Sequence, residues 1–229
     1  MKIFSFGLDI EPGKYKYKGE CFDKLVEKFS PQKETPFTVE FINDDIDKCD
    51  AVVFSKAKRL DLVLIDLEKI ENRLEKDIPS QEKAALEKAQ SLLEQEKALC
   101  EGGFLPEQEN IFRTLQLVTI KPSLEKEEAL DMGVLIQEVI AKSGLLLFFT
   151  AGKKEVHTWA VKKEETILEA AGKIHSDLKR GFIKGDVVNC SELDNFFNMA
   201  EARSKGLMKV VGRDYIMQEN DIIEIRFSV

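Results

Sequence analysis

The chain has few of the residues that build metal sites and disulfide frameworks. Its 229 residues include four cysteines, two histidines and one tryptophan. No two cysteines stand in a CxxC spacing, so a zinc site would need His157 or His175 to join cysteines from distant segments. We expect reduced thiols, as in proteins of a reducing compartment, and no metal. The cysteines are Cys21, Cys49, Cys100 and Cys190.

Long apolar runs are also missing. No run approaches the roughly 18 apolar residues that a membrane-spanning helix needs. The first ten residues, MKIFSFGLDI, lack the longer apolar core and the small-residue cleavage site of a signal peptide. We therefore expect a soluble, cytoplasmic protein with no membrane partner.

The acidic surplus is confined to one part of the chain. The formal net charge is −8, yet residues 146–229 carry 13 basic and 13 acidic side chains. An acidic first part is a poor electrostatic match for a polyanion, and we expect no DNA partner. The neutral C-terminal part can still carry a local basic patch.

The first 58 residues show a β-α-β-β pattern. Alternation and β-branched residues predict strands at Ile3–Leu8, Phe37–Ile42 and Ala51–Phe54. Helical spacing of apolar residues predicts a helix at Cys21–Phe29, and the polar stretch Tyr15–Gly19 is typical of a loop. This set of elements is too small for a complete nucleotide-binding domain.

Two amphipathic segments follow. Leucines at spacings of three and four predict one helix from Leu60 to Leu74. Pro79 ends it, Ser80 can cap a second helix, and that helix continues to Gly102-Gly103. The pair predicts an antiparallel helical hairpin. Each helix is highly charged with a narrow apolar stripe, so we favour a projecting arm over a pair packed on the domain.

The segment from residue 112 to residue 149 connects the hairpin to the C-terminal part. Phe112–Lys121 has the pattern of a short helix that runs into a strand, and Pro122 ends the strand. Ser123–Lys126 then leads into a helix at Glu127–Ser143, in which Leu130 is one of the apolar residues. The apolar run Leu145–Phe149 predicts the next strand.

The C-terminal part predicts the order ββαβαββ. A turn at Gly152 joins two strands, and Thr166 can cap a helix that runs to His175. Phe182–Asn189 is a strand, and Ser191 can cap a second helix that Gly206 stops. The last two strands contain Val210-Val211 and residues 222–229. This order suits a small mixed sheet wrapped around a helix.

Several motifs in this part resemble the TGS domain of the YchF-type Obg-like ATPases. They are FFTAG (148–152), Glu155-Val156, Trp159, AAGKIHSD (170–177), GFI (181–183), VGRDY (211–215) and DIIEIRFSV (221–229). LDLVLIDLEKIENRLEK (60–76) and LQLVTIKP (115–122) show a weaker similarity to that family's helical arm and to the strand before its base-recognition segment. The resemblance implies a ubiquitin-like β-grasp fold for the last 85 residues or so.

Members of that family are P-loop proteins, so the resemblance implies a phosphate-binding loop near the N-terminus. A P-loop reads GxxxxGK[ST]. The nearest candidate here runs from Gly7 to Gly13 and Lys14, with five residues between the glycines instead of four and Tyr15 in place of the Mg²⁺-binding hydroxyl. Pro12 removes a backbone donor, and the acidic residues of the loop oppose phosphate. The chain contains no DxxG. After Pro122 the family continues with a strand that ends in an Asn-x-x-Glu motif, whereas here Ser123–Lys126 runs straight into a predicted helix.

Other residues were weighed as functional candidates. His175 and Asp177 suggest acid–base chemistry, but a local hydrogen bond is the simpler interpretation because no partner is apparent. Trp159 is more simply a core or rim aromatic than a ligand platform. The cationic candidates for partner binding are Lys173, Lys179, Arg180, Lys184, Arg203, Lys205, Lys209 and Arg213. An ordinary mixed-charge surface is the alternative for these.

We therefore predict an α+β protein with three parts. Residues 1–58 and 104–144 form a reduced P-loop-like α/β remnant, 59–103 the antiparallel hairpin arm, and 145–229 the β-grasp (TGS) domain. The predicted function is that of a catalytically inactive relative without a cofactor, which binds a ribosome or RNA through the TGS domain and a protein through the arm. The alternatives are a residual ATP- or GTP-binding enzyme and a protein-interaction or small-ligand regulatory module.

Overall fold

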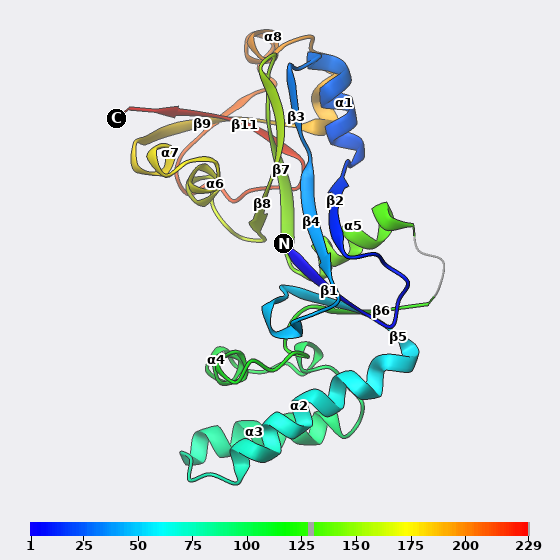
Figure 1. Ribbon diagram of the computed structural model, residues 1–229. Helices are drawn as coiled ribbons and strands as arrows, with labels where there is room; N and C mark the ends of the chain where they lie inside the picture. The colour runs from blue at the N-terminus through cyan, green and yellow to red at the C-terminus, as the bar shows by residue number, and fades with distance from the viewer. Residues whose placement is uncertain (128–130, 229) are drawn as a thin grey trace. The chain divides into compact units, whose positions relative to one another are not determined.

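The computed structural model describes residues 1–127 and 131–228 and divides into two compact units (Figure 1). Unit 1 contains Met1–Tyr15 and Val39–Ser143. Unit 2 contains Lys16–Thr38 and Gly144–Val229. Residues 16–38, which the sequence pattern assigned to the N-terminal remnant, thus lie in the same unit as the C-terminal sheet.

Unit 1 is built on a mainly parallel sheet with the strand order β2-β4-β1-β5-β6. The central strand β1 pairs in parallel with β4 and β5, and β5 pairs in parallel with β6. The strands are β1 (Lys2–Phe6), β2 (Gly13–Tyr17), β4 (Phe37–Ile42), β5 (Ala51–Ser55) and β6 (Ser123–Lys126). β5 is fully apolar apart from its last residue and is buried on both faces, as a central parallel strand must be.

The helices of unit 1 join the sheet to a second apolar cluster. They are α2 (Arg59–Leu74), α3 (Ser80–Leu93), α4 (Pro106–Thr114) and α5 (Met132–Lys142), with short 3₁₀ turns at Ile46–Lys48, Lys56–Lys58 and Leu99–Glu101. Leu62 of α2 packs with Phe4 and Val52 of the sheet. Ile70 of α2 shares a cluster with Leu86 of α3 and Phe112 of α4. The α2–α3 pair is therefore covered along one side by α4.

Unit 2 is a mixed sheet with the order β10-β9-β11-β7-β8-β3. β7 and β8 form an antiparallel hairpin, and β11 lies parallel to β7 and antiparallel to β9. The strands are β3 (Lys33–Thr35), β7 (Leu145–Ala151), β8 (Glu155–Lys162), β9 (Phe182–Asn189), β10 (Lys209–Val211) and β11 (Asp221–Phe227). β3 comes from the N-terminal segment and pairs in parallel with β8.

Helices cover both faces of this sheet. They are α1 (Glu20–Phe29), α6 (Ile167–Ile174), α7 (Ser176–Arg180) and α8 (Met199–Ser204), with a 3₁₀ turn at Cys190–Asn195. On one face, Ile167 of α6 packs with Phe148. On the other, Phe22 and Leu25 of α1 pack with Phe149. The C-terminal elements follow the predicted order ββαβαββ, with α7 added.

A disulfide joins the N-terminal segment to the C-terminal part of unit 2, and it corrects one prediction about the cysteines. Cys21 of α1 and Cys190 after β9 form a disulfide, with Cα atoms 6.1 Å apart. The expectation of four reduced thiols is wrong for this pair and stands for Cys49 and Cys100, which are free. The pair is 169 residues apart in sequence, so it depends on α1 packing on unit 2, which cysteine spacing does not reveal.

Several predicted elements have different bounds or types in the structure. The predicted loop at Tyr15–Gly19 overlaps β2, whose lysines and tyrosines alternate with the period of a strand. The predicted strand before Pro122 is absent from the described residues, and β6 lies just after Pro122, in the segment expected only to lead into the next helix. Pairing with the buried β5 makes this polar segment a strand despite its weak propensity.

Helix ends account for the remaining differences. α3 ends at Leu93 rather than near Gly102, and Glu96 follows with a left-handed φ of 59°. The helix predicted from residue 127 begins at Met132, and Leu130 lies outside the described residues, as does Val229. The helix expected after Ser191 is a 3₁₀ turn followed by α8, which Asn198 caps. None of the helices in the described ranges has the length and apolar character of a membrane span.

Candidate functional site

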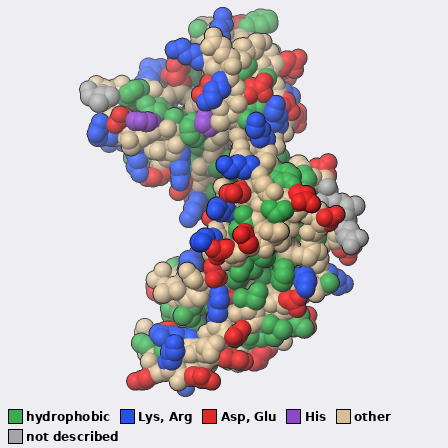
Figure 2. Space-filling view, viewed as in Figure 1, with side chains coloured by type: hydrophobic (Ala, Val, Ile, Leu, Met, Phe, Trp, Pro, Cys, Tyr) green, Lys and Arg blue, Asp and Glu red, His purple; other side chains and the backbone are tan. Residues whose placement is uncertain are grey.

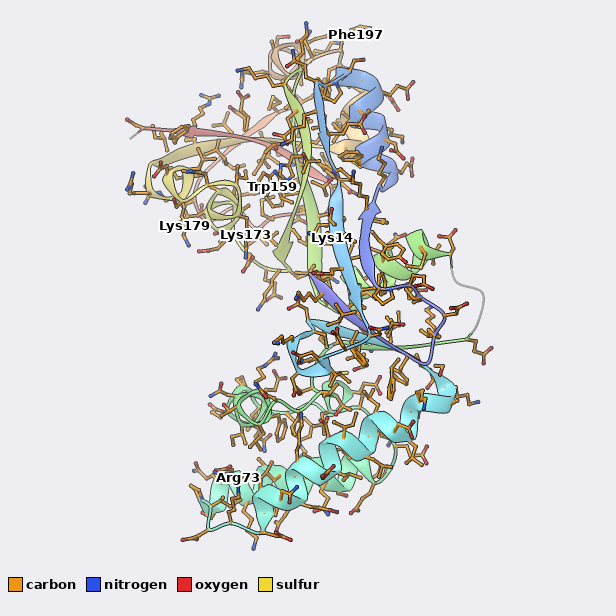
Figure 3. The ribbon with its side chains drawn as sticks, viewed as in Figure 1. Lys14, Arg73, Trp159, Lys173, Lys179 and Phe197 are labelled. Carbon is orange, nitrogen blue, oxygen red and sulfur yellow. A yellow bond between two sulfur atoms is a disulfide. The ribbon has the colours of Figure 1, made fainter. Side chains whose placement is uncertain are left out.

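The loop between β1 and β2 carries the residues of the damaged P-loop pattern. Gly7 has a φ of +70°, and a Cβ there would lie 2.4 Å from Cγ of Lys58. Gly13 and Lys14 are the first residues of β2, and the next helix begins only at Glu20. Lys14 is labelled in Figure 3. A P-loop leads directly into a helix whose first N–H groups face the phosphate, whereas this loop leads into a strand.

Polar groups near this loop are engaged within the protein. The backbone N–H of Ile10 donates to the carbonyl oxygen of Leu8 at 2.9 Å. The ammonium group of Lys58, beside Gly7, donates to Asp61 at 2.6 Å and lies 5.3 Å from the ring centroid of Phe6. These contacts occupy an N–H group and a cation of the kind that a phosphate would require.

A cavity of about 440 Å³ lies at the carboxyl ends of β5 and β6, beside the first turn of α2. Lys56, Arg59, Lys97 and Glu125 are among its lining residues. Arg59 donates from Nε to Glu125 at 2.7 Å and from Nη1 to the carbonyl oxygen of Glu96 at 3.0 Å. Open α/β sheets bind ligands at the carboxyl ends of their strands, so this cavity is the candidate ligand site of unit 1.

The predicted cationic residues of unit 2 separate into groups. Lys173, Lys179 and Arg180 lie on α6 and α7, on the face of the sheet that α6 covers (Figure 3). Lys179 pairs with Glu169 at 2.7 Å, and Arg180 pairs with Asp177 at 2.8 Å. Figure 2 shows basic and acidic side chains interspersed over the visible surface of this unit. Exposed pairs of this kind are weak and leave the cations available to a stronger anion.

A second group lies on the other side of the sheet. Lys184 is on β9 and Arg203 on α8, and Arg203 donates to Asp186 at 3.0 Å. Arg226 of β11 binds the same carboxylate through two hydrogen bonds of 2.7 Å each. These bonds to Arg226, more than those to Arg203, hold the pKa of Asp186 below its usual range.

Three predicted cations join neither group closely. Lys205, just after α8, pairs with Glu201 at 2.7 Å and donates to the carbonyl oxygen of Asn195. Arg213, in the turn between β10 and β11, donates to the carbonyl oxygen of Phe182 at 2.9 Å and has a structural role. Lys209 lies exposed at the start of β10. Arg226 was not among the predicted cations. It lies in the motif DIIEIRFSV, which the sequence analysis used only as evidence for the family resemblance.

The residues weighed for chemistry have structural contacts. Nδ1 of His175 accepts a hydrogen bond from the backbone N–H of Asp177 at 3.1 Å and so caps α7. The indole of Trp159 donates to Thr150 at 3.0 Å and stacks on His157 with ring centroids 3.7 Å apart. Burial lowers the pKa of His157. His175 thus makes the local hydrogen bond expected of it, and Trp159 is a half-buried rim aromatic.

Comparison with known proteins assigns the part of the chain that carries these cations. Residues 145–228 match the family YchF-GTPase_C, described as a protein of unknown function (DUF933). This part of the chain belongs to the YchF-type family. The matched YchF-type domain includes every cationic candidate of unit 2 and excludes Gly7, Gly13 and Lys14.

Two curated relatives show how far the sequence similarity extends. The chain is 39% identical over 104 residues to the "Ribosome-binding ATPase YchF" of Bacillus subtilis (strain 168), covering 45% of this chain and 28% of that protein. It is 44% identical over 91 residues to the "Obg-like ATPase homolog" of Saccharomyces cerevisiae, covering 38% of this chain and 22% of that protein. The chain spans about a quarter of the length of these YchF-type relatives.

The structural similarity covers more of the chain than the sequence similarity does. The structure of the Schizosaccharomyces pombe YchF GTPase aligns with a TM-score of 0.81 and 15% sequence identity, covering 99% of this chain and 97% of that chain. At this identity the likeness concerns the fold alone. The chain therefore has a mixed fold of sheets and helices similar to that of a YchF GTPase.

Proposed function

We propose that this protein is a catalytically inactive YchF-type protein that binds a translation-related RNA or ribonucleoprotein through unit 2. Its YchF-type domain would be a β-grasp (TGS) module, and its place of action the cytoplasm. The observation that carries the proposal is the contrast between the two units. Unit 2 keeps the family signature, while the loop after β1 continues into strand β2.

The geometry of the N-terminal loop supports the loss of catalysis. Triphosphate hydrolysis needs a loop of backbone N–H groups, a lysine at the start of a helix and a hydroxyl that holds Mg²⁺. Here Lys14 is in a strand, and the hydroxyl of Tyr15 donates to the carbonyl oxygen of Glu11 at 2.8 Å. Asp9 and Glu11 add negative charge to the same loop.

The names of the relatives support the choice of partner. The Bacillus subtilis and Mycoplasma genitalium proteins are both named as ribosome-binding ATPases. The domain of this chain that carries the cationic residues, residues 145–228, is the part that matches the YchF-type family model. Cations on a rigid domain attract the phosphates of RNA over a range set by the ionic strength.

Co-sedimentation with ribosomes at low salt tests this function. We expect the protein in the ribosome pellet and expect Lys179→Glu/Arg180→Glu to remain in the supernatant. The matched control, Lys153→Glu/Lys154→Glu, reverses two exposed charges in the β7–β8 turn of the same unit and should pellet like the unaltered protein. Absence of the unaltered protein from the pellet at low salt would contradict the proposal.

The cavity beside α2 favours a second candidate, a residual nucleotide-binding protein. Three cations line it at the carboxyl ends of parallel strands. This function predicts that ATP or GTP with Mg²⁺ raises the melting temperature. Arg59→Ala should remove the shift if the cavity is the site, and Lys14→Ala should remove it if the loop is the site. An unchanged melting temperature across nucleotides would eliminate this candidate.

An exposed apolar pair favours a third candidate, a protein-interaction module. Leu60 and Leu64, one turn apart on α2, are each 50% exposed. A pull-down that recovers a protein but no RNA, and loses it with Leu60→Ser/Leu64→Ser, would support this function over RNA binding. Leu67→Ser is unsuitable as the control because Leu67 packs against the α2–α3 cluster.

A further inference from the structure

A buried carboxylate organises the second group of cations, on the face of the unit 2 sheet that α1 covers. The side chain of Asp186 has no exposed surface, whereas those of Arg203 and Arg226 are 45% and 47% exposed. Arg226 reaches Asp186 along the sheet, and Arg203 reaches it from α8. Each guanidinium is thus held at one edge and turned to solvent at the other. A guanidinium has five N–H donors, and the hydrogen bonds of Arg203 and Arg226 to Asp186 and Glu224 use only part of them.

The strand register places a third cation in the same group. Lys184 of β9 lies directly opposite Arg226 of β11, and Val210 of β10 lies opposite Asp186. Residues directly opposite each other on antiparallel strands share a face, and two like charges there are destabilising. Asp186 offsets part of the repulsion between Lys184 and Arg226, and a bound anion would offset more of it.

One acidic side chain on this face opposes an anion. Glu224 lies opposite Asp186 in the register and pairs with Arg203 at 3.1 Å, with 58% of its side chain exposed. It neutralises one cation, but an exposed ion pair of this kind is weak. Glu224 therefore supplies a test. If the cations bind an anion, removal of Glu224 should raise the affinity for it; if the cluster is only structural, removal should not change that affinity.

We propose that Lys184, Arg203 and Arg226 form a phosphate-binding face on the outer side of β9 and β11, and that its ligand is the backbone of a single-stranded RNA. The proposal rests on the proposed function and names its contact surface. Guanidinium forks match phosphate geometry, and anchoring on a buried carboxylate orders them before the ligand arrives. Val210, which is half exposed beside them, offers an apolar surface to an unstacked base.

Fluorescence anisotropy with a labelled single-stranded RNA of roughly 12 nucleotides, within the usual site sizes of single-strand binders, tests the face. Lys184→Gln should weaken binding several-fold, and Lys184→Gln/Arg226→Gln by about tenfold, with the log–log salt slope reduced by about 1.4 for two lost contacts. Glu224→Gln should bind more tightly than the unaltered protein. The matched control is Lys153→Gln/Lys154→Gln in the β7–β8 turn, which should bind like the unaltered protein. Lys179→Gln/Arg180→Gln tests the α6–α7 side separately.

Arg226→Gln leaves Asp186 with fewer partners and can destabilise the unit, so Lys184→Gln and Glu224→Gln decide the outcome. Opposite changes in affinity for these two variants support the face. If neither changes affinity while Lys179→Gln/Arg180→Gln loses it, RNA binding stands and this face is overturned. If the unaltered protein binds neither the RNA nor ribosomes at low salt, both the face and the proposed function are overturned.

Discussion

The hydroxyl of Tyr215 donates a 2.9 Å hydrogen bond to the buried carboxylate of Asp221. Asp221 also accepts from the backbone N–H of Gln218 at 3.0 Å. Burial first, and then this hydrogen bond, raise the pKa of Tyr215. The bond joins two motifs, VGRDY and DIIEIRFSV, that identify the family. At these positions the family motifs hold β11 to the turn before it. Their role here is to stabilise the fold.

Tyr215→Phe should lower the free energy of unfolding of unit 2 by about 1.5 kcal/mol, because it removes one hydrogen bond to a charged group in a partly buried site. Trp159 is the single tryptophan and lies in this unit, so its fluorescence in urea reports the transition. Tyr15→Phe is the control, since its hydroxyl binds an exposed backbone carbonyl. An unchanged midpoint for Tyr215→Phe would contradict this account.

Asp66→Asn should loosen the segment after α4. The buried carboxylate of Asp66 accepts from the backbone N–H groups of Val118 and Thr119 and from the Thr119 hydroxyl, at 2.6, 2.7 and 2.6 Å. The NH2 group of an asparagine side chain would face at least one of these donors. We expect this to lower the free energy of unfolding by about 2–4 kcal/mol. Hydrogen exchange of the Val118 and Thr119 amides should accelerate.

The control for this change is Asp61→Asn on the same helix. Its carboxylate is half exposed and pairs with Lys58, so its loss should alter stability by less than about 1 kcal/mol. Equal exchange rates in the Asp66→Asn and Asp61→Asn proteins would show that Asp66 does not hold this segment.

Asp186→Asn should destabilise unit 2 at neutral pH by about 3 kcal/mol, because it leaves Arg226 and Arg203 without their buried partner. The pKa of Asp186 is lowered in the folded protein, mainly by hydrogen bonds from Arg226. A lowered carboxyl pKa stabilises the fold above the ordinary value of about 4, and that stabilisation is lost as the pH falls through the folded value. The two proteins should therefore converge in stability in acid.

Urea unfolding at pH 7, 5 and 3, followed by Trp159 fluorescence, measures this convergence. Asp177→Asn, which removes an exposed pair with Arg180, serves as the control and should differ little from the unaltered protein at each pH. A difference between Asp186→Asn and the unaltered protein that stays constant from pH 7 to pH 3 would refute the assigned role.

Alkylation of the denatured protein tests the disulfide. Without reductant, only Cys49 and Cys100 should react, and reduction should expose Cys21 and Cys190 as well. Reduction should also speed hydrogen exchange in α1, because the bond constrains a long loop and is worth about 2–4 kcal/mol. Four alkylated cysteines without reductant would refute the disulfide.

Local patterns in the sequence predicted the elements whose apolar residues follow one period, such as α1, α2, β5 and β9. They failed where long-range pairing decides the structure. Ser123–Lys126 is polar and becomes a strand only because β5 lies beside it. Residues 16–38 appear local to the N-terminal remnant, yet the apolar face of α1 packs on the sheet of unit 2. Periodicity identifies an apolar face but not the surface that covers it.

The cationic site was predicted in part for the same reason. Its eight candidates stand out by charge alone, but their division between the two sides of the sheet depends on strand order. Arg226 and Asp186 belong together only through the pairing of β9 with β11. Without knowledge of that strand register, the sequence alone gives no reason to pair Asp186 with Arg226, which lie 40 residues apart.

The covering of one sheet by segments from both ends of the chain has a consequence for synthesis. Residues 16–38 leave the ribosome before the rest of unit 2, and about a hundred residues separate them from the start of β7. At ordinary elongation rates the delay is roughly 5–20 s. Throughout that interval Phe22 and Leu25 of α1 lack the sheet that buries them in the finished protein. The apolar residues of the α1 segment therefore stay exposed to solvent in the nascent chain until the rest of unit 2 has been synthesised.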